Sequence, residues 1–486
     1  MTIPRWVRAT YEWLDFRLKV GRDIQDVMAH PVPSETASWW YVFGSATAVL
    51  MTLQFATGIL LALVYVPSAA EAWQSLHTLN YQIAFGWYVR AVHGWGSNFM
   101  VAVLLVHMIQ VFLFGAFKYP RELTWTFGVL LLLLTLAMAF TGQIMRFDGD
   151  AYWGLGIGAA MAARVPFIGA WLVGLLIGGP IIAGQTLSRF FTFHVFVLPA
   201  LLIFCVGLHV LLVLKVGISE WPMPGRLVRR KTYIAQYEKL VHDDGVPFVP
   251  NAFSRDLVFD ALVIAAVLAC AAFFGPFGPA GRPDPTLIDT APKPDLFFLW
   301  LYAALALLPA QLETPTILIA PVVALVVLFA LPFVSGEGER SWKVRPMAVL
   351  IVVVLAAGFL ALTWLGIGKP WSPVMSAWSG APIPPQYIAG RTPLEVQGAL
   401  VFQNKQCRNC HLLGGQGGEK GPPLDAVAVQ LTKDQLIRQV LQGSGEMPAY
   451  GHQLSPAQVE ALVAFLRTLR PPGEAPARVA ATAPPP

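Results

Sequence analysis

Residues 87–117 read WYVRAVHGWGSNFMVAVLLVHMIQVFLFGAF, and residues 190–216 read FFTFHVFVLPALLIFCVGLHVLLVLKV. Both stretches are apolar and long enough to cross the ~30 Å hydrocarbon core of a bilayer as helices. Each carries two histidines, and the four are His93, His107, His194 and His209. Ionisable residues are uncommon inside membrane helices and mark functional sites there. The two stretches therefore predict a membrane protein whose function depends on these four side chains.

The spacing of the histidines is matched between the two stretches. Offsets of 14 residues (His93 to His107) and 15 residues (His194 to His209) return close to one helix face at about 100° per residue and separate two levels by roughly 21–22 Å. Antiparallel helices would bring the histidines together in two pairs, His93 with His194 and His107 with His209. Two facing imidazoles can hold one haem iron from both sides. The pattern predicts two bis-histidine haems at two depths of a membrane.

Glycines recur with the same period on neighbouring apolar stretches. Gly44 and Gly58 lie 14 residues apart, as do Gly128 and Gly142. Glycine would let a flat macrocycle approach the backbone at both levels. Each glycine alone also fits ordinary small-residue packing between membrane helices, and a single histidine can simply bond a neighbouring helix. The shared period favours the haem interpretation.

The composition is that of a polytopic membrane protein. Hydrophobic residues make up 56% and charged residues 13% of the 486 residues, and the mean hydropathy is +0.59, which soluble proteins rarely reach. The basic N-terminus lacks a short apolar segment with a cleavage site, so we expect no removable signal peptide. Seven spans are predicted, at about residues 39–66, 87–117, 123–144, 190–216, 257–274, 316–334 and 347–367.

Lysine and arginine predict the topology. The N-terminus and the segments 118–121, 226–231 and 340–345 are basic, whereas residues 67–86 contain neither lysine nor arginine. Positive residues favour the cytoplasmic side, so we expect the N-terminus inside and everything after residue 368 outside. Counting apolar Pro166–Ile182 as a span would move the 226–231 loop outside, so we interpret it as an interfacial or re-entrant piece on the outer face. The pI near 9.0 reflects this topology, and we expect no nucleic-acid partner.

The last hundred residues carry a second type of site. Residues 407–411 read CRNCH, and a C-x-x-C-H run attaches a c-type haem through Cys407 and Cys410 with His411 as axial ligand. Met447 lies 36 residues further on and is the predicted second axial ligand, because His/Met ligation is usual in cytochromes c. His452 is the rival ligand. The turn at 421–424 is expected to brace the back of His411.

These features predict an all-α fold in two parts, a polytopic membrane bundle and a small helical extracytoplasmic haem domain. Cys205 and Cys270 lie in apolar spans and are expected to be core residues rather than a disulfide. The expected boundaries are a dihaem part (1–220), a three-helix part (221–368), a linker (369–388), the haem c domain (389–470) and a tail without fixed structure (471–486).

The membrane part resembles cytochrome b of quinol-oxidising bc complexes over roughly residues 15–368. Residues 120–125 (PRELTW), Ser188-Arg189-Phe190, Leu198-Pro199 and the 15-residue histidine offset are similar to its chloroplast-type (bf) branch. Residues 363–368 (TWLGIG) resemble the end of that branch's separate small subunit, joined here to the first half.

The resemblance implies that His93 and His194 bind the outer haem b and that His107 and His209 bind the inner one. It suggests that Arg90 and Arg121 pair with haem propionates, although each also fits an arginine that extends to the membrane edge. It further implies a multi-subunit complex in a bacterial cytoplasmic membrane, built around a homodimer, with a separate Rieske iron–sulfur protein and with a soluble cytochrome or an oxidase as acceptor.

The chain departs from the family at three places, one of which is Arg146-Phe147 where the family has Pro-Trp at the exit of the third span. The bf branch anchors an extra haem through a cysteine where this chain has Val42, so we expect no such covalent haem. The Pro-Glu-Trp-Tyr signature of the quinol-oxidation site appears as Pro294-Asp295-Leu296-Phe297. Asp in this slot often accompanies low-potential quinones in the family, with menaquinone as a candidate, and the sequence leaves the quinone species open.

Two functions remain open from the sequence. In the first, quinol is oxidised in a pocket formed by Asp148–Trp153, including Tyr152, and by Pro294–Phe297, with Asp295 as proton acceptor and Phe297 as the retained aromatic residue. If Asp295 is only a helix cap, then Asp148, Asp150 or Tyr152 is the acceptor. In the second, the chain is a haem-bearing electron conduit without a working quinol-oxidation site. The altered signature motivates this alternative.

Overall fold

A computed structural model describes residues 4–18, 28–178, 182–283, 292–368, 382–405, 407–417, 421–443, 447, 450–451 and 454–471. Helices dominate the described chain, which confirms the predicted all-α class. The chain divides into two compact units, unit 1 (residues 1–146, 190–279 and 315–361) and unit 2 (residues 147–189, 280–314 and 362–486). Both units are discontinuous in sequence, so the predicted domain boundaries stay predictions.

Seven helical stretches among the described residues are long and apolar enough to cross a membrane, which confirms the predicted number. They are α3 (Phe43–Ala62), α5 (Gly86–Leu113), α6 (Glu122–Ile144), the continuous stretch Gly184–Val216, α13 (Phe253–Phe274), Gln311–Val334 within α15 (Ala310–Val334), and α16 (Pro346–Gly368). Within the described residues of Pro166–Ile182, the helix is α8 (Gly169–Ile177). Nine residues span about 13 Å, too little to cross a bilayer.

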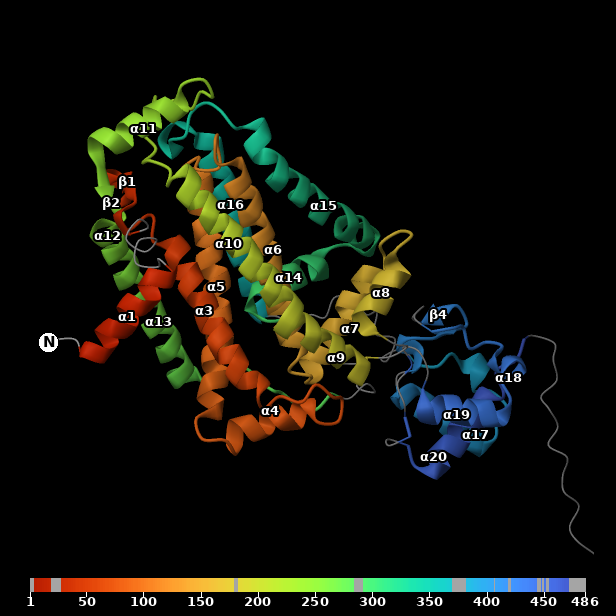
Figure 1. The fold of residues 1–486 in the computed structure, drawn as a ribbon. Helices are drawn as coiled ribbons and strands as arrows, with labels where there is room; N and C mark the ends of the chain where they lie inside the picture. The colour runs from red at the N-terminus through yellow and green to blue at the C-terminus, as the bar shows by residue number, and fades with distance from the viewer. Residues whose placement is uncertain are drawn as a thin grey trace, which may run out of the picture. The chain divides into compact units, whose positions relative to one another are not determined.

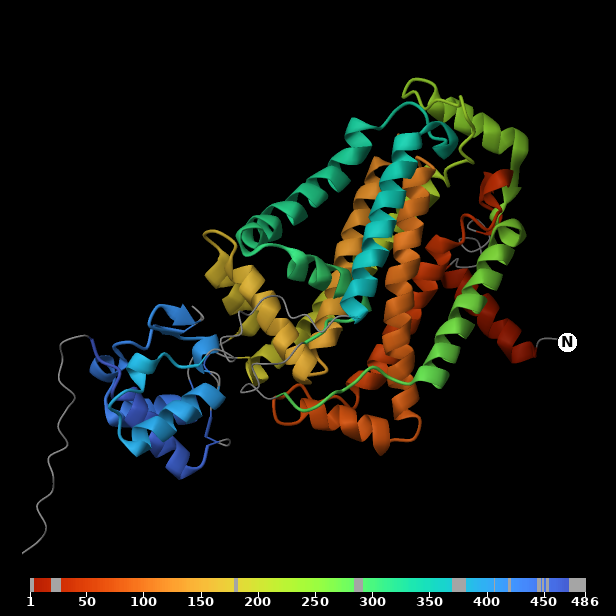
Figure 2. The same cartoon turned by 180° about the vertical axis from the view of Figure 1, so that it is seen from behind.

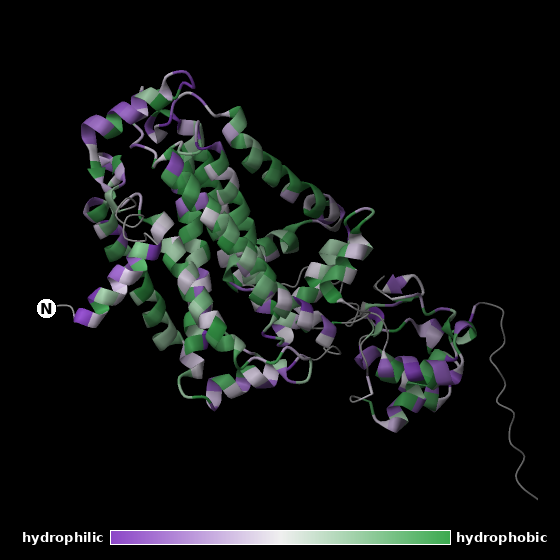
Figure 3. Cartoon of the chain, viewed as in Figure 1, coloured by the Kyte–Doolittle hydropathy of each residue, from purple (hydrophilic) through white to green (hydrophobic). Residues whose placement is uncertain are grey.

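Helices α3, α5, α6 and α10 (Leu198–Val216) run side by side in unit 1, as both views show (Figures 1 and 2). Helix α3 packs on α5, α6 packs on α10, and α13 covers α3 and α5. Hydrophobic residues predominate along these helices in the view of Figure 3, as expected of helices that face lipid as well as one another. The four-helix group places the predicted haem ligands.

Shorter elements lie at the two ends of this group. Helix α4 (Ala72–Tyr81) packs on α5 at one end. At the other end lie the amphipathic α11 (Tyr233–Asp244) and a strand pair in which β1 (Pro31–Pro33) runs antiparallel to β2 (Gly245–Pro247). The remaining short elements of unit 1 are α1 (Arg5–Leu18), η1 (Ser34–Thr36), α12 (Phe248–Asn251) and η4 (Trp342–Val344).

The stretch Gly184–Val216 is not a uniform α-helix. It consists of α9 (Gly184–Thr192), a π-helical turn η2 (Phe193–Val197) and α10. Pro199, in the first turn of α10, has no backbone N–H and so cannot continue the ordinary i→i−4 ladder. A π-turn holds one extra residue per turn, and it lies where His194 is placed.

Residues 147–189 and 280–314 of unit 2 contain three more helices. They are α7 (Gly149–Ala163), α8, and α14 (Leu299–Leu307), which follows the 3-10 turn η3 (Leu296–Phe298). Asp148 caps α7, because its Oδ1 accepts the backbone N–H of Ala151 at 2.9 Å. Its Oδ2 accepts the N–H of Ala280 at 3.0 Å, so the same carboxylate fixes the loop that follows residue 279.

The C-terminal helices have their own core. Phe402 and Phe465 pack with ring centroids 5.5 Å apart. A Cβ at Gly398 would lie 1.9 Å from the Ala461 carbonyl oxygen, so only glycine permits this close crossing of α17 and α20. The elements are η6 (Pro385–Tyr387), α17 (Pro393–Asn404), η7 (Cys407–Asn409), β3 (Leu412–Leu413), β4 (Gln416–Gly417), α18 (Val427–Gln430), α19 (Lys433–Gln442) and α20 (Pro456–Leu466).

Candidate functional site: two histidine pairs and a C-terminal haem motif

The structure brings the four membrane histidines together in two pairs. His93 of α5 and His194 of η2 have ring centroids 6.3 Å apart and ring planes at 77°. His107 of α5 and His209 of α10 interact electrostatically, and each ring lies against a glycine of the neighbouring helix, Gly44 and Gly128. The pairing is the one that the matched offsets predict, with one pair at each level of the four-helix group.

Threonine hydroxyls hold the rings of the first pair. Thr57 Oγ1 lies 2.9 Å from Nδ1 of His93, and Thr141 Oγ1 lies 2.9 Å from Nδ1 of His194. Each hydroxyl also donates its hydrogen to a carbonyl of its own helix, Leu53 at 2.7 Å and Ala137 at 2.8 Å. The hydroxyl oxygens must therefore accept from the rings. Nδ1 then carries the proton, and Nε2 keeps the lone pair that a metal needs.

The second pair has a different environment. Among the described residues, no hydrogen-bond partner lies at Nδ1 of His107 or at Nδ1 of His209, and both atoms are buried. No threonine hydroxyl therefore orients these two rings. A ring that carries its proton on Nδ1 still keeps the lone pair of Nε2 for a metal.

The four glycines of the period lie against the histidine rings. A Cβ placed on Gly44 would lie 3.4 Å from His107 Cε1, and one on Gly58 would lie 3.3 Å from His93 Cε1. The corresponding distances are 3.5 Å from Gly128 to His209 Cε1 and 2.8 Å from Gly142 to His194 Cε1. Glycine at these four positions therefore leaves space between the helices for both imidazole rings of a pair. This donor set fits a bis-histidine haem at each level.

The two arginines predicted to bind propionates have different surroundings. Arg90 donates to the Asn80 side chain at 3.1 Å and to the Gly278 carbonyl at 2.6 Å, and also to the Phe277 carbonyl. These bonds fasten α5 to the loop after α13. Arg121 donates to the Gly217 carbonyl at 3.0 Å and to the Tyr233 hydroxyl at 2.8 Å, while its Nη2 is buried without a partner among the described residues. Nη2 of Arg121 could therefore bind a further anion.

The predicted quinol residues lie in unit 2. Both oxygens of Asp148 accept backbone N–H groups, so the structure favours a capping role for this residue over a proton-accepting one. Asp295 precedes η3 but makes no side-chain capping bond, unlike the plain cap that its position suggests. Phe297 lies in η3 and is half-buried. Tyr152 of α7 packs edge-on against Trp153 with centroids 5.5 Å apart.

Tyr302 is a residue that the sequence reasoning missed. It lies on α14, is 4% exposed, and has a buried hydroxyl without a hydrogen-bond partner. Asp150 acts on this hydroxyl electrostatically, which links the α7 segment to α14. No periodic signal in the sequence marks Tyr302, because Asp150, which acts on its hydroxyl, lies on another helix.

The C-terminal motif has the expected local geometry. Cys407 begins the turn η7 and Cys410 follows it, and neither forms a disulfide. Nδ1 of His411 donates to the Pro422 carbonyl at 2.8 Å, which confirms that the 421–424 turn braces this ring and leaves Nε2 as the donor to a metal. A Cβ on Gly421 would lie 2.4 Å from His411 Cε1. These residues fit a covalent haem with His411 as axial ligand.

Met447 packs against the core of the C-terminal domain, and its Sδ accepts a hydrogen bond from Gln439 Nε2 at 3.3 Å. The rival ligand His452 lies outside the described residues. Cys205 is buried and Cys270 half-buried, and both are free thiols, as expected for core residues.

Comparisons with known proteins agree with these features. Residues 27–217 match the family model described as cytochrome b/b6/petB, and residues 284–380 match cytochrome b(C-terminal)/b6/petD. Residues 395–466 match the model described as cytochrome C oxidase, cbb3-type, subunit III.

Individual relatives extend this result. Cytochrome b6 of Prochlorococcus marinus (strain NATL1A) and of Synechococcus sp. (strain RCC307) are each 38% identical over 209 residues, which cover 43% of this chain and 95% of the relative. A solved structure titled "Hyperthermophilic respiratory Complex III" is similar with a TM-score of 0.60 at 26% identity, over 74% of this chain and 92% of that one.

Together these matches show a multi-pass membrane protein that carries haem b and haem c and works as an oxidoreductase subunit of the bc/b6f type in a multi-subunit complex with quinone. Both halves of cytochrome b and a cytochrome c domain lie on one polypeptide. The chain belongs to the cytochrome b/b6 family and carries a cytochrome c domain at its C-terminus.

Proposed function

We propose that this chain is the cytochrome b/c fusion subunit of a quinol:cytochrome c oxidoreductase that oxidises quinol near the outer face of a bacterial cytoplasmic membrane. The proposed topology has the N-terminus in the cytoplasm and the cytochrome c domain outside. The observation that carries the proposal is the pair of histidine levels, with glycines at each level and Nδ1 of His93 and His194 held by threonines.

The proposed cofactors are two haems b and one haem c. His93 with His194 would hold the outer haem b, and His107 with His209 the inner one. Cys407 and Cys410 would attach haem c covalently, with His411 and Met447 as its axial ligands. When bound, these groups supply one-electron redox chemistry at two depths of the membrane and on its outer side.

The proposed quinol site uses residues of unit 2. Oxidation of a quinol releases two protons, so a carboxylate within reach of the hydroxyl groups is chemically useful. Asp295 is half-buried and does not cap η3 through its side chain, so its carboxylate is our candidate for this role. Phe297 would pack against the quinol ring. Tyr152, Asp150 and Tyr302 would form the rest of the wall of the proposed quinol pocket. Both Asp148 oxygens accept backbone N–H groups, so Asp295 is the first candidate for the proton acceptor.

Partners follow from what the chain lacks. The four cysteines comprise two in apolar spans and two in the haem c motif, so a separate Rieske iron–sulfur protein would take the first electron of each quinol. A soluble cytochrome or a terminal oxidase would receive electrons at the outer side. The proposed assembly is a homodimer within a larger complex, and menaquinone is a candidate substrate.

A second candidate function is an electron conduit without its own quinol-oxidation site. The shortened signature Pro294–Phe297 and the capping role of Asp148 favour it. The two functions differ in turnover. The purified complex should oxidise a short-chain quinol at an inhibitor-sensitive rate and carry a Rieske EPR signal, and a pyridine haemochrome assay should give two haems b for each haem c. Absence of turnover with this haem ratio intact would support the conduit.

A further inference from the structure

A buried cluster of charged and hydroxyl side chains lies at the end of unit 1 that carries α11. Glu220 is 1% exposed, Arg340 3%, Tyr233 4% and Arg121 6%. The four residues come from four separate places in the sequence: the start of α6, the loop after α10, the start of α11 and the loop before α16. The fold therefore gathers an ionic cluster that no single motif contains.

The cluster is a continuous chain of bonds. Arg121 Nη1 donates to the Tyr233 hydroxyl at 2.8 Å, and that hydroxyl donates to Glu220 Oε2 at 2.6 Å. Arg340 Nη1 lies 2.6 Å from Glu220 Oε1, and its Nη2 donates to Ser219 Oγ at 2.7 Å. Tyr233 thus joins an arginine at the start of a histidine-facing helix to a buried carboxylate eleven residues beyond His209.

Glu220 stays negatively charged in this cluster. Burial by itself raises the pKa of the Glu220 carboxyl, but Arg340, the Tyr233 hydroxyl and Arg121 outweigh it and hold the pKa below its ordinary value. A buried ion pair adds little net stability, because both groups lose their hydration. The cluster therefore calls for a role beyond holding the loops together.

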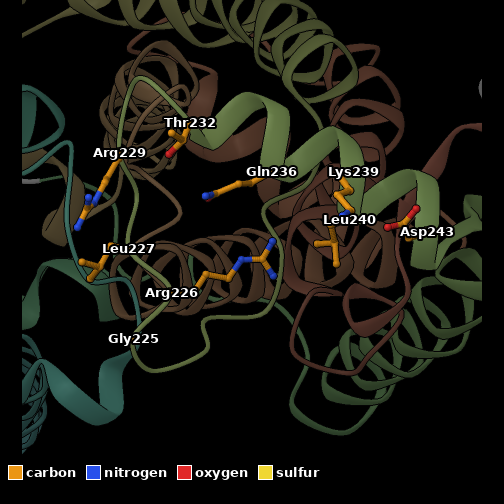
Figure 4. A pocket seen from close by; sticks show the side chains of 9 residues that line it. All are labelled: Gly225, Arg226, Leu227, Arg229, Thr232, Gln236, Lys239, Leu240 and Asp243. Atoms are coloured by element: carbon orange, nitrogen blue, oxygen red, sulfur yellow. The ribbon is translucent and has the colours of Figure 1, made fainter.

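One end of the cluster reaches water. Arg226 Nε lies 3.7 Å from Glu220 Oε1, and the Arg226 side chain is 34% exposed. Arg226 also lines a hollow of about 700 Å³ between its loop and α11, with Gln236 and Lys239 on the helix side (Figure 4). The charge of Glu220 is thus screened on the Arg226 side and buried on the Tyr233 side.

The other end of the cluster lies at the start of α6, the end of that helix nearer to the inner histidine level. Arg121 precedes Gly128 by seven residues, and Gly128 faces His209, so the backbone positions of Arg121 and Gly128 are about two helical turns, roughly 10 Å, apart along α6. Its plane is fixed by Tyr233 and Tyr237, whose ring centroids lie 5.6 Å and 5.1 Å away. In a poorly hydrated interior, charges still interact strongly at such distances.

We propose that Glu220 is a positioning residue for the inner haem site: through Tyr233 it fixes the Arg121 guanidinium, and together with Arg340 it sets the charge that this site experiences. The inference rests on the proposed function, because it assumes a haem held by His107 and His209. Glu220 and Arg340 would thereby tune the reduction potential of that haem, while neither touches it.

Redox titration of the purified complex, followed separately for the two b components, tests this. Glu220→Gln removes the negative charge and keeps the shape, so the ratio of reduced to oxidised inner haem at a fixed potential should rise about tenfold, which is about 59 mV for one electron. Arg340→Gln should lower the ratio, and the double variant should lie near the wild type. Glu220→Asp should restore the wild-type value.

Tyr233→Phe separates positioning from charge. It keeps Glu220 and Arg340 but releases Arg121, so the reduced fraction of the inner haem should fall. Glu337→Gln is the matched control, because this carboxylate lies at the same end of unit 1, pairs with Arg230 at 3.3 Å and is 51% exposed. Its charge is screened by water, and neither b component should move.

The outcomes are distinguishable. An unchanged inner potential in both Glu220→Gln and Tyr233→Phe, with the inner haem retained, overturns the inference and leaves the proposed function intact. Equal shifts of both b components would also overturn it, because they report a global change. A wild-type complex that lacks a second haem b would instead refute the proposed function, before any variant is compared.

Discussion

Thr141 Oγ1 lies 2.9 Å from Nδ1 of His194 and donates its own hydrogen to the Ala137 carbonyl, so the imidazole N–H must donate to the threonine. Thr57 holds His93 in the same way. Nδ1 of His107 and Nδ1 of His209 have no such acceptor. The two levels thus share a ligand type but differ in what orients the rings and how basic Nε2 is.

The threonine contact predicts an effect confined to one level. Thr141→Val removes the acceptor for His194, which makes the imidazole a weaker electron donor. The potential of the outer haem b should rise, and its affinity should fall roughly 10- to 100-fold. Redox titration with haem quantification measures both. Thr126→Val is the matched control, because Thr126 lies on the same helix and bonds only its own helix carbonyl at 2.9 Å. A shift of the inner component instead would contradict the assignment.

Ligand removal tests the pairing of levels. His107→Leu or His209→Leu should abolish the inner haem b and leave the outer one, because the pairs belong to different levels. Low-temperature spectra and redox titration should each lose one b component, and it should be the same component in both variants. Loss of different components from the two variants would show that these histidines do not share an iron.

The glycines predict a graded steric effect. An alanine Cβ at position 142 would lie 2.8 Å from His194 Cε1, closer than such contacts normally come, whereas one at position 128 would lie an ordinary 3.5 Å from His209 Cε1. Gly142→Ala should therefore displace His194 and strip most of the outer haem. Gly128→Ala should retain more of its haem. Equal losses in the two variants would argue that room for the macrocycle, and not for the histidine, decides these positions.

The haem c domain allows a test of its axial ligand. Met447→Ala should keep haem c attached, because Cys407 and Cys410 hold it covalently. Its potential should fall, since a thioether ligand favours the ferrous state. A denaturing gel stained for haem checks attachment, and redox titration checks the potential. An unchanged potential would exclude Met447 and turn attention to His452.

Asp295→Asn should slow quinol oxidation without changing haem content. The substitution keeps the size of the side chain and removes its capacity to take a proton. Turnover should fall and the pH profile should shift, whereas Asp148→Asn should mainly reduce thermal stability, because its oxygens cap α7 and fix the Ala280 loop. Full activity of Asp295→Asn across the pH range would move the proton role to the Asp150–Tyr302 pair.

The sequence predicted the seven spans and the pairing of histidines because both depend on periodic patterns. It did not predict the π-turn η2, although the 15-residue offset and Pro199 were its signals. The extra residue held in that turn accompanies the offset of 15 residues, where the other histidine helix has 14. Thr57, Thr141 and Tyr302 could not be found, since their roles depend on neighbours from other helices.

The ion pair between Glu220 and Arg340 could not be predicted from the sequence either. They lie 120 residues apart and become partners only when two loops close over the end of the bundle. Each reads in the sequence as an ordinary loop charge. Asp148, in contrast, is predicted from the sequence as an alternative proton acceptor to Asp295, and its backbone partners favour a structural role.

The fusion itself has a consequence for kinetics. Helix α16 ends at Gly368, and the described chain resumes at Pro382 after 13 residues. Even a fully extended segment of that length reaches only about 50 Å, so the cytochrome c domain cannot diffuse away from its own membrane part. Its effective concentration there is on the order of millimolar. Dilution or added salt should therefore slow electron delivery to the external acceptor and leave the transfer into haem c unaffected.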